Sequence, residues 1–251
     1  MLRLRLLGAA WRVRPPEETA VINLPRLCLL ANAVSRRAVL AGTVGLAAAV
    51  SFTLPALAQK KPAGPDTVPL DEFMKAGDLP ELSVGPADAK VTIVEYASMT
   101  CGHCANFHNK VFPELKTKYI DTGKLRFIFR EFPLEDFAAA ASMLARCSGG
   151  EKTYPLIGIL FAKQDQWAAA AASARVAKLF EIAKQAGFTQ ETFDKCLTDQ
   201  KLLEQINAVR DRGGNKFGVS STPTFFINGK KMAASPTMAE FEKLLEPLLK
   251  G

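Results

Sequence analysis

Most of this chain lacks an excess of charge of one sign. The 251 residues carry a formal net charge of +7, which taken alone would suggest a surface for polyanions. Residues 1–58, however, contain seven arginines and only two acidic residues, so the remainder holds 25 basic and 23 acidic residues. The basic excess therefore lies in a terminal segment and not on a folded surface. The sequence predicts no nucleic-acid partner.

Histidine is also scarce, with only two residues in the chain. Cys101 and Cys104 have the Cys-x-x-Cys spacing of half a zinc site, which needs two further ligands. After residue 58 the remaining histidines and cysteines are His103, His108, Cys147 and Cys196. None of them has the spacing of a second ligand pair, so we expect no metal ion.

Cofactor motifs are missing as well. Covalent haem attachment requires histidine directly after the second cysteine, and that position is Ala105. The chain has no glycine-rich nucleotide-binding motif. We therefore expect a protein without a cofactor.

The first 58 residues have the features of an export signal. Ser35, Arg36 and Arg37 precede an apolar run rich in alanine and glycine, and residues 56–58 (Ala-Leu-Ala) resemble a cleavage site. Paired arginines of this kind are typical of twin-arginine signals in bacteria. We expect a cleaved signal and a periplasmic protein. An ordinary secretory signal and a retained membrane anchor remain as alternatives.

The chain after the signal begins with polar, proline- and glycine-containing residues, and we expect residues 59–83 to be a leader and linker. A β-branched strand follows at 91–96, and a second strand is predicted at 125–132. Between them, apolar residues recur every four positions from Phe107 to Tyr119, which predicts a helix.

The second half of the sequence predicts a long helical segment and then a return to strands. Residues from about 134 to 217 are alanine-rich and contain no convincing strand. A strand at 224–227 is followed by Asn228-Gly229, a strong hairpin signal, and by a terminal amphipathic helix. We expect an α/β domain over 84–251, in which an all-helical insertion separates a β-α-β half from a β-β-α half.

The dithiol motif Cys101-Gly-His-Cys104 lies between the first strand and its helix. Cysteine reacts as the thiolate, and a helix N-terminus stabilises a negative charge on Cys101. His103 can add a positive charge or a hydrogen-bond donor. Stabilising the thiolate makes the disulfide the less stable form, so the motif favours oxidation of other thiols. We expect Cys101 to be the reactive cysteine and Cys104 the resolving one, together forming a redox-active disulfide.

This order of a strand, Cys-Gly-His-Cys, a helical insertion and Ser221-Thr222-Pro223-Thr224 resembles the DsbA-like family of periplasmic thiol:disulfide oxidoreductases, which have a thioredoxin fold. The resemblance covers roughly residues 84–250. It implies that Pro223 is a cis-proline beside the dithiol and that Thr222 presents backbone groups to an extended substrate. A plain strand start is the alternative for this proline.

The resemblance also implies a buried acidic residue on the strand before the motif. Glu95, six residues before Cys101, occupies that position and could relay the proton that Cys104 must lose. An exposed carboxylate on the strand surface is the alternative.

Cys147 and Cys196 are the remaining cysteines after residue 58. Export through an oxidising compartment favours pairing, so we expect a structural disulfide between them. Two separate buried thiols are the alternative.

The resulting expectation is a monomeric enzyme that donates disulfides to unfolded or reduced exported proteins. The resemblance implies a quinone-linked membrane partner that reoxidises it. An isomerase or reductase is the alternative, because threonine before the cis-proline occurs in reducing relatives as well. A copper-binding thiol protein is a third possibility, although methionine and histidine are scarce near the motif.

Overall fold

The computed structural model describes residues 65–233 and 235–250. The predicted export signal at 1–58 and the first part of the predicted leader lie outside these residues. No helix among the described residues is both long enough and apolar enough to cross a membrane.

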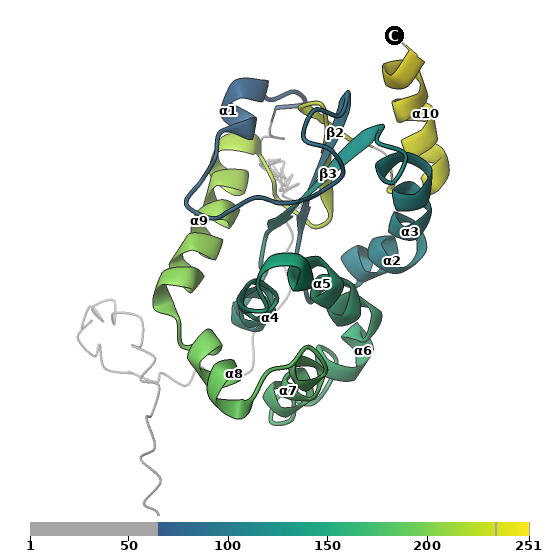
Figure 1. Cartoon of the computed structure of the whole chain (residues 1–251). Coiled ribbons are helices and arrows are strands. Elements are labelled where there is room, and N and C mark those ends of the chain that lie inside the picture. Colours follow the sequence, from purple (N-terminus) through teal and green to yellow (C-terminus); the bar gives the residue numbers. More distant parts are fainter. Residues whose placement is uncertain (1–64, 234, 251) are drawn as a thin grey trace, which may run out of the picture. The chain divides into compact units, whose positions relative to one another are not determined.

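A five-stranded sheet forms the centre of the domain (Figure 1). Its order is β1 (Leu82–Val84), β3 (Leu125–Glu131), β2 (Val91–Ala97), β4 (Thr224–Ile227) and β5 (Lys230–Lys231). The β2 and β3 strands are parallel, and every other neighbouring pair is antiparallel. Six of the seven residues of β2 are buried. Burial of both faces of the strand explains why its sequence is an apolar run rather than an alternating one.

Helices cover the two faces of this sheet. Figure 1 shows α2 (Gly102–Lys110), α3 (Phe112–Leu115) and α10 (Met238–Lys250) on one side, and α1 (Leu70–Met74) and α9 (Gln200–Phe217) on the other. A π-helical turn at Lys116–Ile120 follows α3. The predicted apolar face of the first helical segment is confirmed, because the side chains at 107, 111, 115 and 119 are all buried.

The segment predicted as an all-helical insertion contains only helices, turns and bends, as expected. It comprises α4 (Asp136–Cys147), a 3-10 turn (Gly150–Lys152), α5 (Thr153–Ala162), α6 (Gln164–Trp167), α7 (Arg175–Gln185), α8 (Gln190–Leu197) and α9.

The chain returns to the sheet through a hairpin, which is also confirmed. Asn228 and Gly229 both have positive φ angles, 46° and 79°, as a two-residue turn between β4 and β5 requires. The terminal helix is amphipathic as predicted, but only part of its apolar face is covered. Phe241 and Leu245 are fully buried, whereas Leu248 is 38% exposed.

One predicted boundary is wrong. Residues from Asp66 onward belong to the fold and are not a linker that ends at residue 83. Lys231 donates its backbone N–H to the Asp66 carbonyl (2.8 Å), and Val68 donates to the Gly229 carbonyl (2.9 Å). Phe73 in α1 is fully buried. A five-residue helix is too short to show an apolar period, so the sequence did not reveal it.

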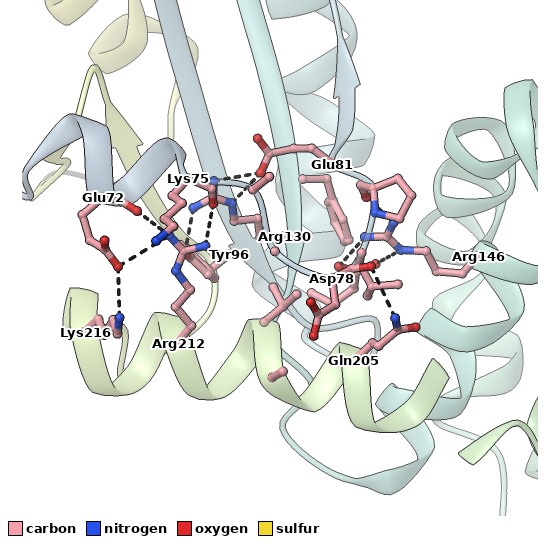
Figure 2. A pocket seen from close by; sticks show the side chains of 18 residues that line it. Glu72, Lys75, Asp78, Glu81, Tyr96, Arg130, Arg146, Gln205, Arg212 and Lys216 are labelled. Carbon is pink, nitrogen blue, oxygen red and sulfur yellow. Dashed lines mark hydrogen bonds and ion pairs between the residues drawn. The ribbon is translucent and has the colours of Figure 1, made fainter. Parts of the chain in front are cut away.

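Three arginines fasten the segment between α1 and β1 to the rest of the domain (Figure 2). Arg212 in α9 donates to carbonyl groups at the end of α1. Arg146 donates to the Pro80 carbonyl (2.5 Å), and Arg130 to the Glu81 carboxylate (2.8 Å). They line a cavity of about 280 Å³. Because these arginines are already paired with groups of the protein, we assign the cavity a structural role.

Close packing of α9 on the sheet generates a stability prediction. A Cβ atom on Gly213 would lie 2.6 Å from Cε1 of the buried Tyr96 ring, whereas a Cβ atom on Gly214 would have no neighbour closer than 3.6 Å. Overpacking costs about 1–3 kcal/mol, and replacing a helical glycine with alanine otherwise gains about 0.5–1 kcal/mol. We expect Gly213→Ala to lower the free energy of unfolding in urea and Gly214→Ala to leave it unchanged or raise it. Equal effects would contradict this account of the packing.

Candidate functional site

The two cysteines of the motif occupy the first turn of α2, just beyond the end of β2. Cys101 is the N-cap residue of the helix, and its own backbone N–H is held by the Ser98 carbonyl (3.1 Å). The next backbone amides of the helix have no partner within the helix and are available to an anion. Cys101 is partly exposed, whereas Cys104 is fully buried, and both are free thiols. Only one of the two sulfurs is therefore open to another protein.

Hydrogen bonds lower the pKa of Cys101 from its ordinary value of 9.0 to about 5. The largest contribution is a hydrogen bond from the Cys104 thiol. The Thr222 side chain and the backbone N–H groups of Cys104 and His103 add to it, and partial burial opposes it. At neutral pH the Cys101 sulfur is a thiolate, which is the nucleophilic form.

His103 contributes to this effect through its backbone. Its side chain is exposed to solvent, and its influence on the pKa of Cys101 comes from the backbone N–H group. Any residue other than proline at position 103 would supply this N–H, so the catalytic role expected of the His103 side chain stays a prediction.

The pKa of Cys104 is shifted in the opposite direction. Burial raises its pKa, and the neighbouring Cys101 and the negative charge of Glu95 raise it further. The two sulfurs of one motif thus differ strongly in acidity. Cys104 remains a thiol under conditions in which Cys101 is ionised.

Thr222 and Pro223 precede β4 and lie beside the dithiol. The peptide bond between them is cis. The Cys101 thiol donates a hydrogen bond to the Thr222 carbonyl (3.3 Å). The Thr222 hydroxyl is buried without a hydrogen-bond partner, so it is free to donate to the sulfur once Cys101 ionises.

Glu95 lies in the core beneath the motif. It is fully buried, which excludes the alternative of an exposed carboxylate. Its Oε2 atom is 2.7 Å from Nε2 of His108, a residue that sequence reasoning left out of the site. His108 lies four residues after Cys104, and residues at this spacing share a face of a helix. That spacing is the signal that could have placed His108 next to the buried acid.

Gln164 is a second residue that the sequence did not single out. Its side-chain amide in α6 donates to the backbone carbonyls of Met99 (2.8 Å) and Cys101 (3.1 Å). The helical insertion thereby holds the loop that leads into the motif. No local pattern in the sequence distinguishes this glutamine from a surface residue.

A disulfide joins Cys147, at the end of α4, to Cys196 in α8, with a distance of 6.1 Å between the two Cα atoms. The bond closes a separation of 49 residues within the insertion. Constraining a loop of that length in the unfolded chain corresponds to about 4 kcal/mol in the chain-entropy model. This pair lies apart from the Cys101 motif in the sequence and is a structural element of the insertion.

Metal ligation finds no candidate within the part of the chain that the structure describes. No three His, Cys, Asp or Glu side chains there cluster closely enough to hold a metal ion.

The acidity of Cys101 generates a prediction for Thr222. We expect the thiolate absorbance of the reduced protein to titrate with a midpoint near pH 5. In Thr222→Val, which keeps the shape of the side chain but removes the hydroxyl, the midpoint should move upward because the thiolate loses a hydrogen bond. An unchanged midpoint in a folded variant would show that the hydroxyl does not contact the sulfur.

The same shift predicts how the stability of the reduced form depends on pH. The pKa of Cys101 is lower in the folded protein than in the unfolded chain, so the thiolate contributes stability that grows above pH 5 and is lost as pH falls towards 5. Between about pH 5 and pH 8, Cys104 stays protonated in both states and adds no opposing trend. The thermal midpoint of the reduced form, relative to that of the disulfide form, should therefore rise over this range. A flat difference would contradict the low pKa.

Comparisons with known proteins agree with this geometry. A family model described as "Thioredoxin" matches residues 78–247. A Rickettsia bellii protein named "Putative protein-disulfide oxidoreductase" is 38% identical over 150 residues, which are 59% of this chain and 57% of that protein. The chain thus spans little more than half the length of this curated relative.

Matches to solved structures cover nearly the whole length of the matched proteins. The crystal structure of Wolbachia pipientis alpha-DsbA1 is 31% identical, with a TM-score of 0.65, and the match covers 72% of this chain and 96% of that one. BdbD from Bacillus subtilis, at 23% identity and a TM-score of 0.59, covers 68% of this chain and 94% of its own, and shares the fold. The fold, the position of the dithiol and these matches agree, and the chain belongs to the DsbA-like family of the thioredoxin superfamily.

Proposed function

We propose that this protein is an exported thiol:disulfide oxidoreductase that donates disulfides to other exported proteins through Cys101 and Cys104. The observation that carries the proposal is the pKa of about 5 at Cys101, caused by hydrogen bonds at the start of α2. A thiolate stabilised in this way favours the reduced form of the protein over its disulfide form. The disulfide therefore tends to pass to other thiols.

The first step of this reaction is directed to Cys101, because Cys104 is fully buried. A substrate thiolate attacks the Cys101 sulfur, the bond between Cys101 and Cys104 breaks, and the electron pair of that bond moves to Cys104. A second substrate thiolate then attacks the substrate sulfur of the mixed disulfide. Cys101 leaves as a thiolate, and a low pKa makes it a good leaving group.

Thr222 and Pro223 are the proposed contact for the substrate backbone. The Thr222 carbonyl lies within hydrogen-bond distance of the Cys101 thiol. An extended chain held against this carbonyl would pass directly over the reactive sulfur. Such a contact involves the backbone and does not select a side chain, which suits an enzyme with many substrates.

The proposal also includes the substrates, the compartment and the membrane partner of the enzyme. The substrates are unfolded or reduced exported proteins in the bacterial periplasm. The protein acts as a monomer, and a quinone-linked membrane protein restores its disulfide. Export depends on the signal predicted in residues 1–58.

The decisive measurement is the equilibrium reduction potential of the Cys101–Cys104 pair against glutathione, followed by acid quenching and alkylation. We expect a potential well above the glutathione couple, with the protein still largely reduced in a buffer that oxidises thioredoxin. A potential near or below about −270 mV, the thioredoxin value, would reject disulfide donation and favour a reductase or isomerase.

A matched variant assigns the measured potential to the correct pair. Replacing both Cys147 and Cys196 with alanine should lower the free energy of unfolding by about 2–5 kcal/mol and leave the potential unchanged. A change in potential would mean that the insertion disulfide takes part in exchange.

A further inference from the structure

This inference rests on the proposed function. In that reaction the buried Cys104 has to gain and lose a proton although water does not reach it. When the disulfide opens, Cys104 leaves with a negative charge in a site where burial raises its pKa. When the disulfide forms again, the Cys104 thiol has to lose its proton first. A group inside the protein must therefore give a proton to this sulfur and take it back.

Glu95 is placed to exchange that proton. It contacts His108, which lies one helical turn after Cys104 on the same face of α2, and its negative charge raises the pKa of Cys104. One carboxylate oxygen, Oε1, is buried without a hydrogen-bond partner. The other, Oε2, contacts Nε2 of His108 at 2.7 Å. Oε2 is thus held by His108, whereas Oε1 has no partner and is available to exchange a proton.

His108 is itself fixed within an aromatic cluster. Its imidazole stacks on the Phe161 ring, with 4.4 Å between the ring centres and 15° between the planes. Four more phenylalanine rings lie around it, at positions 107, 112, 127 and 129. Only 3% of the His108 side chain is exposed. A close-packed ring of this kind does not reorient freely, so it fixes the oxygen that it contacts.

We propose that His108 is a positioning residue for the exchange at Cys104. Its Nε2–H donates to Oε2 of Glu95 and keeps the carboxylate from rotating, which leaves the unpartnered Oε1 for the exchange with the sulfur. During closure of a mixed disulfide at Cys101, the Cys104 thiol passes its proton to Oε1 and the resulting thiolate attacks the Cys101 sulfur. The bond between Cys101 and the partner sulfur breaks, and the partner leaves as a thiolate. In disulfide donation the same proton returns to Cys104.

Oxidation of the reduced protein by glutathione disulfide separates the two steps that the proposal distinguishes. Cys101 first attacks glutathione disulfide and forms a mixed disulfide, and Cys104 then closes the ring. Rapid mixing, acid quenching and mass spectrometry give the rate of each step in one experiment. The first step does not require the proton of Cys104, so it serves as an internal control.

Three substitutions of His108 test the role of its contact with Glu95. The Gln variant keeps an N–H at the position of Nε2, the Asn variant has the same amide but is too short to reach Oε2, and the Leu variant has no donor. General acid–base catalysis contributes about 10²–10⁴-fold, of which we expect mispositioning to lose about tenfold. Ring closure should slow by that factor in His108→Leu and His108→Asn. In His108→Gln its rate should stay within about threefold of wild type. The rate of the first step should be unchanged in all three variants.

Glu95→Gln provides the second arm of the experiment. Ring closure should slow in this variant as well, and His108→Leu added to it should slow closure by less than about twofold, because there is no carboxylate left to position. Near-UV circular dichroism and the thermal midpoint establish that each variant is folded. The Asn and Gln pair keeps the test decisive if His108→Leu does not fold.

Several outcomes would overturn the proposal for His108. They are closure in folded His108→Leu or His108→Asn within about twofold of wild type, closure in His108→Gln as slow as in His108→Asn, and a full additional loss on the Glu95→Gln background. A reduction potential near or below that of thioredoxin would instead reject disulfide donation, and the closure rates of the His108 variants would stand as a separate result. The two failures are thus distinguishable.

Discussion

A negative charge on one sulfur atom, held at the N-terminus of α2, is the interaction on which the rest of the site depends. The charge is stabilised by the Cys104 thiol, the Thr222 hydroxyl and two backbone amides. These donors come from different parts of the chain, and they converge because β2 and β4 are neighbouring strands. The sheet therefore brings the Thr222–Pro223 turn against the first turn of α2, and the chemistry of Cys101 follows from that contact.

The two sulfurs of the motif also differ in exposure and in acidity. Cys101 is partly exposed and acidic, whereas Cys104 is buried and its pKa is raised. Beneath the motif the core holds two buried polar side chains, Glu95 and His108, which contact each other among aromatic rings. Placing a charge there costs stability unless it is paired. The contact between Glu95 and His108 supplies that pairing, and the proton exchange proposed for it is a role that hydrophobic residues could not perform.

Several separate contacts hold together the elements that surround the site. Gln164 ties the insertion to the loop before Cys101, and the disulfide between Cys147 and Cys196 holds two helices of that insertion together. On the other face of the sheet, Arg130 and its neighbours fix the segment that begins the fold. These contacts keep the elements that meet at the dithiol from moving independently.

The order of strands and helices, the extent of the insertion and the position of Cys101 at the start of a helix can all be predicted from the sequence. These features depend on local patterns of apolar residues, turn residues and cysteine spacing, which act over a few positions. Such patterns do not reveal that the fold begins near Asp66, because the short helix that carries Phe73 has no periodic pattern. The contacts of His108 with Glu95 and of Gln164 with Met99 become visible only in the folded domain. Such contacts join residues 13 and 65 positions apart, and they exist only once the sheet and the insertion have packed together.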